Sequence, residues 1–526
     1  MVISLRRLLG GAAIIAAAAA SPVQAIAQAP GGTMVIVGTS SPRHLNPAVQ
    51  SGAATAIPGT QLFASPLKYD GQWNPQPYLA KSWSIAENGL SVTLNLVDNA
   101  VFHDGTPVTS EDVAFSIETM RNNHPFTSMY APVTAVETPD THTAVIRLSR
   151  PHPAIMLALS GPLCPIIPKH VFGDGQNIRS HPANAAPIGS GPFRFVSWEP
   201  GGDIVLERFD DFFIEGRPYL DGIVIRRIRD SSAIVIAMKN GDADMYPFVG
   251  ESREIRALEE AEDLVVTRTG YEAVGPIVWL AFNAGKEPLN DVRVRQAIAY
   301  AIDRDFIVNA LQRGRSTIQR GPIIESSPFF DETIEAYDLD LEKSNALLDE
   351  AGHVPDGDGT RFRLTIDYAP FLPEQLKTPA EYMKSQLRKV GIGIELRASP
   401  DLATWANRVS THEFDLTMDL LFNWGDPVIG VHRTYLSSNI LKGVIWSNTQ
   451  QYSNPKVDEL LEAAGKEIDP ARRKALYSEF QHEVARDLPV YWLNSLPFHS
   501  AFRKSMVNPP LGIWGPMQSM DDLAFQ

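Results

Sequence analysis

Strand-like and helix-like hydrophobic patterns alternate along this chain, and that alternation limits the folds open to it. Residues Leu90–Leu96 alternate apolar and polar side chains with a period of two, which predicts a half-buried strand. Val294, Ile298 and Ile302 recur at helical spacing after Asp291, which predicts a helix that starts there. A strand, a helix and a strand are then expected over residues 362–368, 380–390 and 392–398. The pattern predicts an α/β or mixed α+β protein.

Several helix ends are marked by residues that satisfy free backbone groups. Thr109–Asp112 supplies hydroxyl and carboxylate groups that can cap the helix after it. Asn454-Pro455 and Asp469-Pro470 each place a capping residue before a proline at the first helical position. Two consecutive helices are therefore expected over about 457–466 and 471–486. Gly352 is expected to end an earlier helix, because glycine readily takes the left-handed conformation.

The length, charge and cysteine content exclude several classes of protein. With 526 residues, the chain exceeds what one hydrophobic core usually holds, so two or three domains are expected. It carries 46 Lys and Arg against 61 Asp and Glu, a formal net charge of −15. Nucleic-acid binding is not expected, because phosphates require clustered basic residues. The single cysteine, Cys164, excludes an internal disulfide and a thiolate metal cluster.

The N-terminal segment has the layout of a secretory signal peptide. Arg6 and Arg7 precede the uncharged apolar run Leu8–Ala20, and Ala25-Ile26-Ala27 resembles a cleavage site. The apolar run is too short to cross a membrane. We therefore expect residues 1–27 to be a signal peptide and the mature chain to be a soluble periplasmic protein. Cys164 lies far from the cleavage region, so a lipid-anchored mature protein is not expected.

Motifs for catalysis and metal binding are incomplete in this sequence. Gly189-Ser190-Gly191 lacks the spacing of a nucleophile elbow, and His412-Glu413 lacks the second histidine of a zinc helix. Asp356–Gly359 resembles the start of a calcium loop, but the distal glutamate is missing. We therefore expect no enzymatic activity, no cofactor and no metal site. A binding function is favoured.

Several segments together resemble the family 5 extracytoplasmic solute-binding proteins, which are the dipeptide- and oligopeptide-binding components of ABC importers. The resemblance covers essentially the whole mature chain. It rests on segments 77–83, 102–113, 188–193, 241–244, 282–283, 292–298, 347–352 and 457–461. Any one of these segments is a weak signal, whereas all of them in this order are specific to the family.

The resemblance implies two lobes joined by a hinge, which close over a ligand and deliver it to the permease subunits of an ABC transporter in the inner membrane. It maps lobe I to residues 28–58, 186–282 and 495–526, an inserted domain to 59–185, and lobe II to 283–494. A monomer that binds a small peptide or peptide-like solute is expected. An opine, a sugar or a metal chelate remains an alternative ligand. A secreted hydrolase with unrecognised catalytic residues is the alternative of another class.

The resemblance also suggests an anchor for the ligand. Peptide binders of the family hold the ligand's amino group with an aspartate downstream of a tryptophan, because a buried ammonium group requires a carboxylate partner. Asp426 is the corresponding candidate here, and Trp424 is the candidate for an apolar or cation–π wall. The spacing between the two is shorter than the family's usual pattern. A structural Asp-Pro turn is the alternative for Asp426.

Further candidates surround the expected cleft. Arg433 is expected to pair with a ligand carboxylate, with a salt bridge inside the lobe as the alternative. Asn283 can hydrogen-bond to a peptide-like backbone. Trp405 and Tyr435 are candidates for the cleft wall, with core packing as the alternative. The remaining candidates, on the loop that forms a lip of the cleft, are His44 and Asn46.

Overall fold

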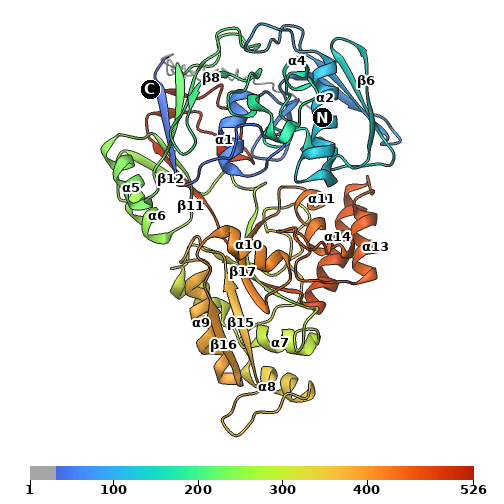
Figure 1. Ribbon diagram of the computed structural model, residues 1–526, viewed down its shortest axis with the longest axis vertical. Coiled ribbons are helices and arrows are strands. Elements are labelled where there is room, and N and C mark those ends of the chain that lie inside the picture. Colours follow the sequence, from blue (N-terminus) through green and yellow to red (C-terminus); the bar gives the residue numbers. More distant parts are fainter. Residues whose placement is uncertain (1–30) are drawn as a thin grey trace, which may run out of the picture.

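The structure is a computed structural model, and it describes residues 31–526. The predicted signal peptide, residues 1–27, lies outside the described residues. Three large sheets organise the chain into an upper part and a lower part in Figure 1. We call the part built on the seven-stranded sheet lobe I, the four-stranded part beside it the inserted domain, and the part built on the six-stranded sheet lobe II. The prediction of a mixed helix-and-sheet protein with two lobes is confirmed.

Lobe I is built on a sheet with strand order β12-β19-β11-β1-β10-β9-β8. Helices α5 and α6 cover one face, where Val37, Ile234 and Leu258 belong to one buried cluster. Helix α1 lies on the other side of the sheet, near the centre of lobe I in Figure 1. The elements are β1 (Thr33–Gly38), α1 (Ala53–Leu62), β8 (Phe193–Trp198), β9 (Ile204–Arg208), β10 (Gly222–Arg227), α5 (Ser231–Asn240), β11 (Met245–Val249), α6 (Ser252–Glu259), β12 (Leu264–Thr267) and β19 (His499–Arg503).

The inserted domain has a four-stranded antiparallel sheet with order β4-β5-β7-β6, packed against α2. The predicted capping motif is present, because Asp112 accepts hydrogen bonds from the backbone N–H and the hydroxyl of Thr109, both at 2.9 Å. Cys164 is buried and unpaired. The elements are β4 (Ala80–Ile85), β5 (Ser91–Leu96), α2 (Ser110–Asn123), η1 (Thr127–Met129), β6 (Val133–Asp140), β7 (Thr143–Leu148), α3 (Ile155–Ala158) and α4 (Lys169–Phe172).

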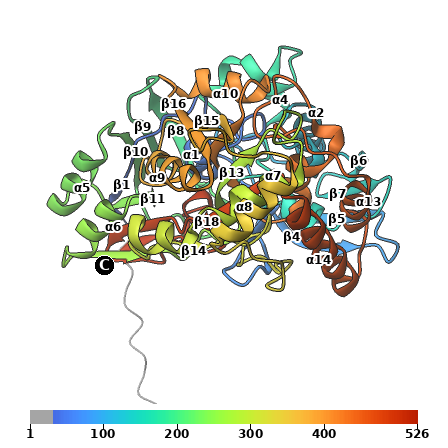
Figure 2. The ribbon, with the colours of Figure 1, turned by 90° about the horizontal axis from the view of Figure 1, so that it is seen from below.

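Lobe II is built on a sheet with order β14-β18-β13-β17-β15-β16. In the view from below (Figure 2), α13 and α14 lie on the opposite side of the molecule from α5 and α6 of lobe I. The elements are β13 (Pro276–Phe282), α7 (Val292–Tyr300), the π-helix η4 (Phe306–Leu311), β14 (Thr317–Ile318), α8 (Leu341–Glu350), β15 (Phe362–Tyr368), α9 (Lys377–Leu387), β16 (Ile392–Arg397), α10 (Leu402–Ser410), β17 (Leu416–Phe422), α11 (Pro427–Gly430), α12 (His432–Tyr435), α13 (Pro455–Ala464), α14 (Pro470–Asp487) and β18 (Val490–Ser495).

The remaining strands form two small ribbons, and the rest of the described chain has no long apolar helix. The ribbons pair β2 with β3 and β20 with β21. Their bounds are Leu67–Tyr69, Pro75–Pro77, Met506–Val507 and Ala524–Phe525. Among residues 31–526, no helix has the length and apolar character needed to cross a membrane.

The expected boundary between lobe I and lobe II at residue 282 is wrong, because strand β13 belongs to lobe II. The sequence assigned residues up to 282 to lobe I, but β13 pairs with β17 and β18 in the sheet of lobe II. All seven residues of β13 are buried, so its apolar run fits the centre of either sheet and its partners cannot be read locally. The chain therefore passes from lobe I to lobe II before Pro276. It returns between β18 and β19.

Candidate ligand-binding cleft

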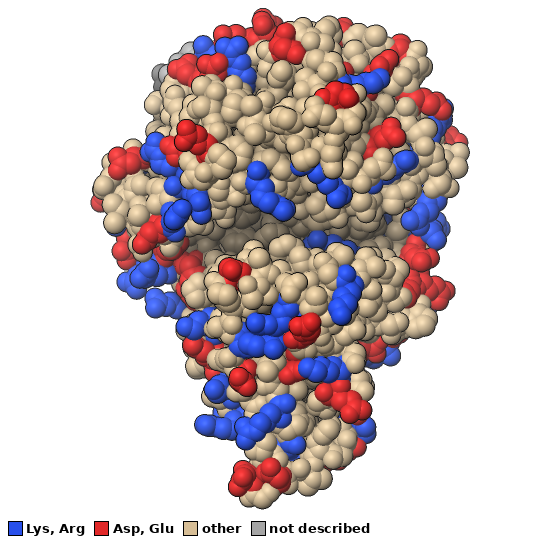
Figure 3. All heavy atoms as spheres, viewed as in Figure 1, with Lys and Arg blue, Asp and Glu red and all other residues tan. Residues whose placement is uncertain are grey.

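The edge of the lobe I sheet that faces lobe II is identified by its topology. Strand β1 runs parallel to β10 and β11, so the carboxyl ends of all three strands lie at one edge. Val249 at the end of β11 pairs with His499 at the start of β19, where the chain has just returned from lobe II. This edge and the loop after β1, residues 39–50, therefore face lobe II. Figure 3 shows a deep hollow between the two lobes at this level.

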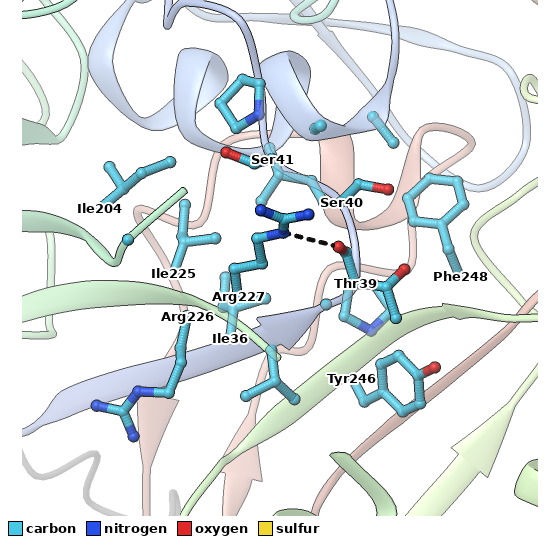
Figure 4. Close-up of a pocket in the computed structure, with 18 residues that line it drawn as sticks. Ile36, Thr39, Ser40, Ser41, Ile204, Ile225, Arg226, Arg227, Tyr246 and Phe248 are labelled. Carbon is cyan, nitrogen blue, oxygen red and sulfur yellow. Dashed lines mark hydrogen bonds between the residues drawn. The ribbon is translucent and has the colours of Figure 1, made fainter. Parts of the chain in front are cut away.

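A cavity of about 130 Å³ opens at this edge of lobe I. It lies where β1 leaves the sheet, between the start of α1 and the ends of β10 and β11 (Figure 4). The side chain of Arg227 donates from Nε to the carbonyl oxygen of Thr39 at 3.1 Å, which fixes the start of the loop. The hydroxyls of Ser40 and Ser41 and the ring of Phe248 also line the cavity.

A continuous row of aromatic rings, which we call the aromatic floor, joins this cavity to lobe II. Phe248 of lobe I packs against Phe498 with ring centres 5.3 Å apart, and Phe498 lies 6.1 Å from Phe422 at the end of β17. Phe422 then lies 5.7 Å from Trp424. Trp424 in turn lies 5.1 Å from Phe126 of the inserted domain. The floor therefore spans the hinge and joins lobe I, lobe II and the inserted domain.

Trp424 is held in this row by an unusual backbone. Its φ angle is +50° and that of Gly425 is +77°, so two consecutive residues take the left-handed conformation. For a bulky residue such as tryptophan this conformation costs energy and persists only where the surrounding structure enforces it. A side chain at Gly425 would also place a Cβ 2.4 Å from Leu157. The strained backbone at these two residues fixes the position of the Trp424 ring within the aromatic floor.

Arg433 lies where lobe II meets the inserted domain. Its guanidinium sits over the Phe126 ring, 5.0 Å from the ring centre. Within residues 31–526 no carboxylate lies within 4.0 Å of it, and its buried Nε has no hydrogen-bond partner. Burial lowers the pKa of Arg433 to about 10, partly offset by the charge of Asp419, so the side chain remains a cation at neutral pH. A half-buried cation with an unused donor is suited to holding an anion.

Asp419 is a second charged group close to Arg433 that the sequence did not single out. It occupies the middle of β17, where it is 4% exposed. The indole Nε1 of Trp446 donates to one carboxylate oxygen at 2.8 Å, and the backbone N–H of Leu420 donates to the other at 2.7 Å. Burial raises the pKa of Asp419 to about 7, although these hydrogen bonds and Arg433 oppose the shift. Its carboxyl group therefore changes charge near neutral pH.

Asp426 already has a cationic partner inside lobe II. Its two oxygens accept hydrogen bonds from both terminal nitrogens of Arg473 on α14, each at 2.8 Å. One oxygen also accepts from the backbone N–H of Val428 at the start of α11. Burial, the largest single effect, would raise the pKa of Asp426, but the charge and hydrogen bonds of Arg473 and the hydrogen bond from Val428 together hold the pKa below its usual range. A ligand ammonium at Asp426 would have to compete with Arg473, so the anchor role stays a prediction.

Three other candidates lie inside lobe II with their polar atoms already bonded. Trp405 is fully buried and donates to Thr417 at 3.1 Å, and Tyr435 accepts from the indole of Trp492 at 2.9 Å. Asn283 follows the end of β13 that is distant from the crossing into lobe I, and it donates to two backbone carbonyl oxygens. Tyr435 shares helix α12 with Arg433, but its hydroxyl group is engaged by Trp492. The geometry of Trp405 and Tyr435 fits the core-packing alternative, and the role of Asn283 in ligand binding stays a prediction.

The loop after β1 carries the last two candidates. Asn46 is fully buried, donates to Asn184 at 2.9 Å and accepts from the backbone of Ala48 at 2.9 Å, so it shapes the loop. His44 is half-buried and lines a second cavity of about 570 Å³. Burial, followed by the charge of Arg43, lowers the pKa of His44. His44 therefore faces open space, whereas Asn46 does not.

The lobes touch on both sides of the hollow. The hydroxyl of Ser128 in the inserted domain donates to the carbonyl oxygen of Val428 in lobe II at 3.1 Å. On the other side, the backbone N–H of Ser252 at the start of α6 donates to the carboxylate of Glu374 in lobe II at 3.0 Å. Lobe II is therefore held to the inserted domain on one flank and to lobe I on the other.

The sequence missed the cleft residues whose partners are distant along the chain. Phe126 and Phe248 belong to segments with no motif, and only the fold brings them to one surface. Asp419 did leave a signal, since it is a carboxylate within the otherwise apolar strand Leu416–Phe422, where an unpaired charge is costly. Trp446 lies in an irregular segment, and no sequence pattern marks it as a functional residue.

Comparisons with known proteins match this architecture. The family model "Bacterial extracellular solute-binding proteins, family 5 Middle" matches residues 74–442. The glutathione-binding protein GsiB of Pectobacterium atrosepticum is 26% identical over 512 residues, covering 95% of each chain. A Brucella ovis protein provisionally named as an ABC transporter peptide-binding protein is 28% identical over 503 residues, covering 90% of each chain.

A solved structure agrees with the same assignment. The binding protein AgaA from A. tumefaciens R10, solved in complex with agropinic acid, is 26% identical and superposes with a TM-score of 0.79. The match covers 94% of this chain and 99% of that chain. The two-lobed fold, a family model over most of the chain and full-length relatives agree with one another. The chain belongs to the bacterial extracellular solute-binding proteins of family 5.

Proposed function

We propose that this chain is the periplasmic substrate-binding protein of an ABC importer, and that it binds a peptide or peptide-like solute between its lobes. It delivers the solute to permease subunits in the inner membrane and performs no covalent chemistry. The relatives named for glutathione and peptide binding support this ligand class. The chain would reach the periplasm through its N-terminal signal and act there as a soluble monomer without a lipid anchor.

The observation that carries the proposal is the position of Arg433. This cation has no carboxylate partner within the described chain, lies against the ring of Phe126 at the meeting point of the lobes, and adjoins the apolar floor. A peptide offers a carboxylate to the guanidinium and apolar side chains to the floor. Binding there contacts both lobes at once, which favours the closed arrangement.

Asp419 completes the proposed site on the side of lobe II. Its buried carboxyl group lies near Arg433 and is held by the indole of Trp446. A ligand ammonium group beside it would stabilise the charged form, because a nearby cation lowers a carboxyl pKa. We therefore place the amino group of a peptide nearer to Asp419 than to Asp426, whose oxygens are engaged by Arg473.

The test is a thermal-shift screen with di- to hexapeptides, opines and sugars, repeated with C-terminal amides of the peptides that bind. A bound ligand at a hundredfold excess over Kd adds about 2.7 kcal/mol of stability. In the wild type, a peptide with a free C-terminal carboxylate should stabilise the protein more than its amide does. Arg433→Gln should abolish this difference in stabilisation. Arg472→Gln, at an exposed ion pair on α14, is the control and should keep it. The proposal fails if no ligand stabilises the protein, and above all if the pure protein hydrolyses peptides or esters.

A further inference from the structure

Basic side chains gather around the cleft. The cavity of about 570 Å³ beside the loop after β1 is lined by Arg43, His44, Val49, Gln50, Asn123, Pro125 and Arg179, with no Asp or Glu among them. The smaller cavity at the end of β1 is lined by Arg227 and by Arg226, which pairs with Asp203 at 3.0 Å, and no acidic residue lines it. Figure 3 shows basic side chains along the lower edge of lobe I, above the hollow. On a chain with a net charge of −15, this local excess of positive charge is a feature of the cleft.

The polar groups of the larger cavity are arranged as hydrogen-bond donors. Arg179 donates from one terminal nitrogen to the carbonyl oxygen of Asn123 at 3.0 Å, which holds its guanidinium at the cavity. In the part of the chain that the structure describes, no carboxylate lies within 4.0 Å of Arg43 or Arg179. The Nδ1 atom of His44 accepts the backbone N–H of Asn46 at 3.3 Å, so a neutral His44 ring carries its proton on Nε2. All three side chains can therefore donate to one anion.

Two consecutive residues connect the larger cavity with Arg433. Pro125 lines the cavity. The ring of the next residue, Phe126, makes a cation–π contact with the guanidinium of Arg433. A cavity beside β12 and β14 differs in charge. It is lined by Arg268 but also by Glu272 and Glu325, so its charges are mixed.

We infer that the solute carries at least two anionic groups, one held by Arg433 and the other by Arg43, Arg179 and His44 in the larger cavity. This inference rests on the proposed function and narrows its ligand class to acidic peptides and comparable polycarboxylates. Guanidinium groups suit this task because they bind carboxylates through paired hydrogen bonds. The cluster also speeds the capture of an anionic solute, more strongly at low ionic strength.

The experiment compares matched pairs of probes by isothermal titration calorimetry. Each pair consists of a peptide of two to six residues with an internal or terminal Glu and the same peptide with Gln, such as Ala-Glu and Ala-Gln. Glutathione is included as a dicarboxylate probe. We expect the Glu member to bind at least tenfold tighter at low salt, with a smaller ratio at high salt. The double variant Arg43→Gln/Arg179→Gln should bind both members of a pair alike, whereas Arg472→Gln should keep the preference.

The outcomes separate this inference from the proposed function. If Glu and Gln members bind equally well to the wild type, or if the preference survives in the double variant, the inference is wrong while peptide binding stands. If only neutral peptides bind, the inference is also wrong and peptide binding also stands. If no peptide, opine or sugar binds, both proposals fall. Arg43 and Arg179 are exposed, so their replacement does not disturb a core.

Discussion

The buried ion pair between Asp426 and Arg473 allows the sharpest stability prediction. The two residues are 7% and 5% exposed and share two hydrogen bonds of 2.8 Å. Asp426→Asn keeps the shape and the acceptor for Val428 at the start of α11 but removes the charge. Arg473 is then left as a buried cation without its counter-charge. Loss of one partner from a buried pair costs about 3–5 kcal/mol.

The exposed pair Arg147–Glu137 is the matched control. Its side chains are 46% and 52% exposed and screened by solvent, so Glu137→Gln should leave the free energy of unfolding almost unchanged. Urea denaturation followed by circular dichroism and by tryptophan fluorescence gives both values, provided that the two transitions coincide. A loss below about 1 kcal/mol for Asp426→Asn would refute the assignment of this carboxylate to lobe II's own structure.

The pH dependence of the same variant has a defined sign. The pKa of Asp426 is below its usual range, so the stability from the pair is fully present above the ordinary aspartate pKa of about 3.9. That stability is lost as the pH falls through the lowered pKa of the folded protein. The difference between wild type and Asp426→Asn should therefore be constant from pH 5 to 7 and shrink below about pH 4. A difference that grows on acidification contradicts the reasoning.

Three further changes test other parts of the account. Trp405→Ala should destabilise the protein by about 3–5 kcal/mol in urea denaturation, because it empties a fully buried site, and should leave ligand affinity in calorimetry unchanged. Asn283→Ala should cost about 1–3 kcal/mol by leaving buried backbone carbonyls unpaired, again without changing the affinity. Burial, Glu374 and Glu254 raise the pKa of Glu251 to about 7, so the folded state holds a proton that the unfolded state releases between about pH 4.5 and 7. Stability should fall across that window as pH rises, and Glu251→Gln should flatten this dependence; an unchanged slope contradicts the assignment.

Local structure was predictable where its causes are local. The capped helices and the strands at 362–368 and 392–397 follow from residues within a few positions of each other, and the structure has them within a few residues of the expected bounds. The lobe to which β13 belongs was not predictable in this way. An all-apolar strand specifies burial but not its neighbours, and here the neighbours come from residues 416–422 and 490–495.

The candidate site was predictable only in part, for a related reason. Arg433 and Trp424 were found because they follow a recognisable segment, and the structure brings both to Phe126. The partner of Asp426 is 47 residues away along the chain, so no local pattern distinguishes a carboxylate that is free for a ligand from one already paired. Phe126 and Phe248 are 122 residues apart and become one floor only when the inserted domain and lobe I meet lobe II.

Native mass spectrometry of the protein purified from its own cells tests the central claim most directly. We expect one small solute bound per chain, carrying carboxylate groups, and its loss from the Arg433→Gln variant that still folds. Denaturation of the complex then releases the solute for identification. A wild-type protein that carries no solute and gains none from peptides or opines added in excess would contradict the account. So would a bound solute without an anionic group that the Arg433→Gln variant retains at full occupancy.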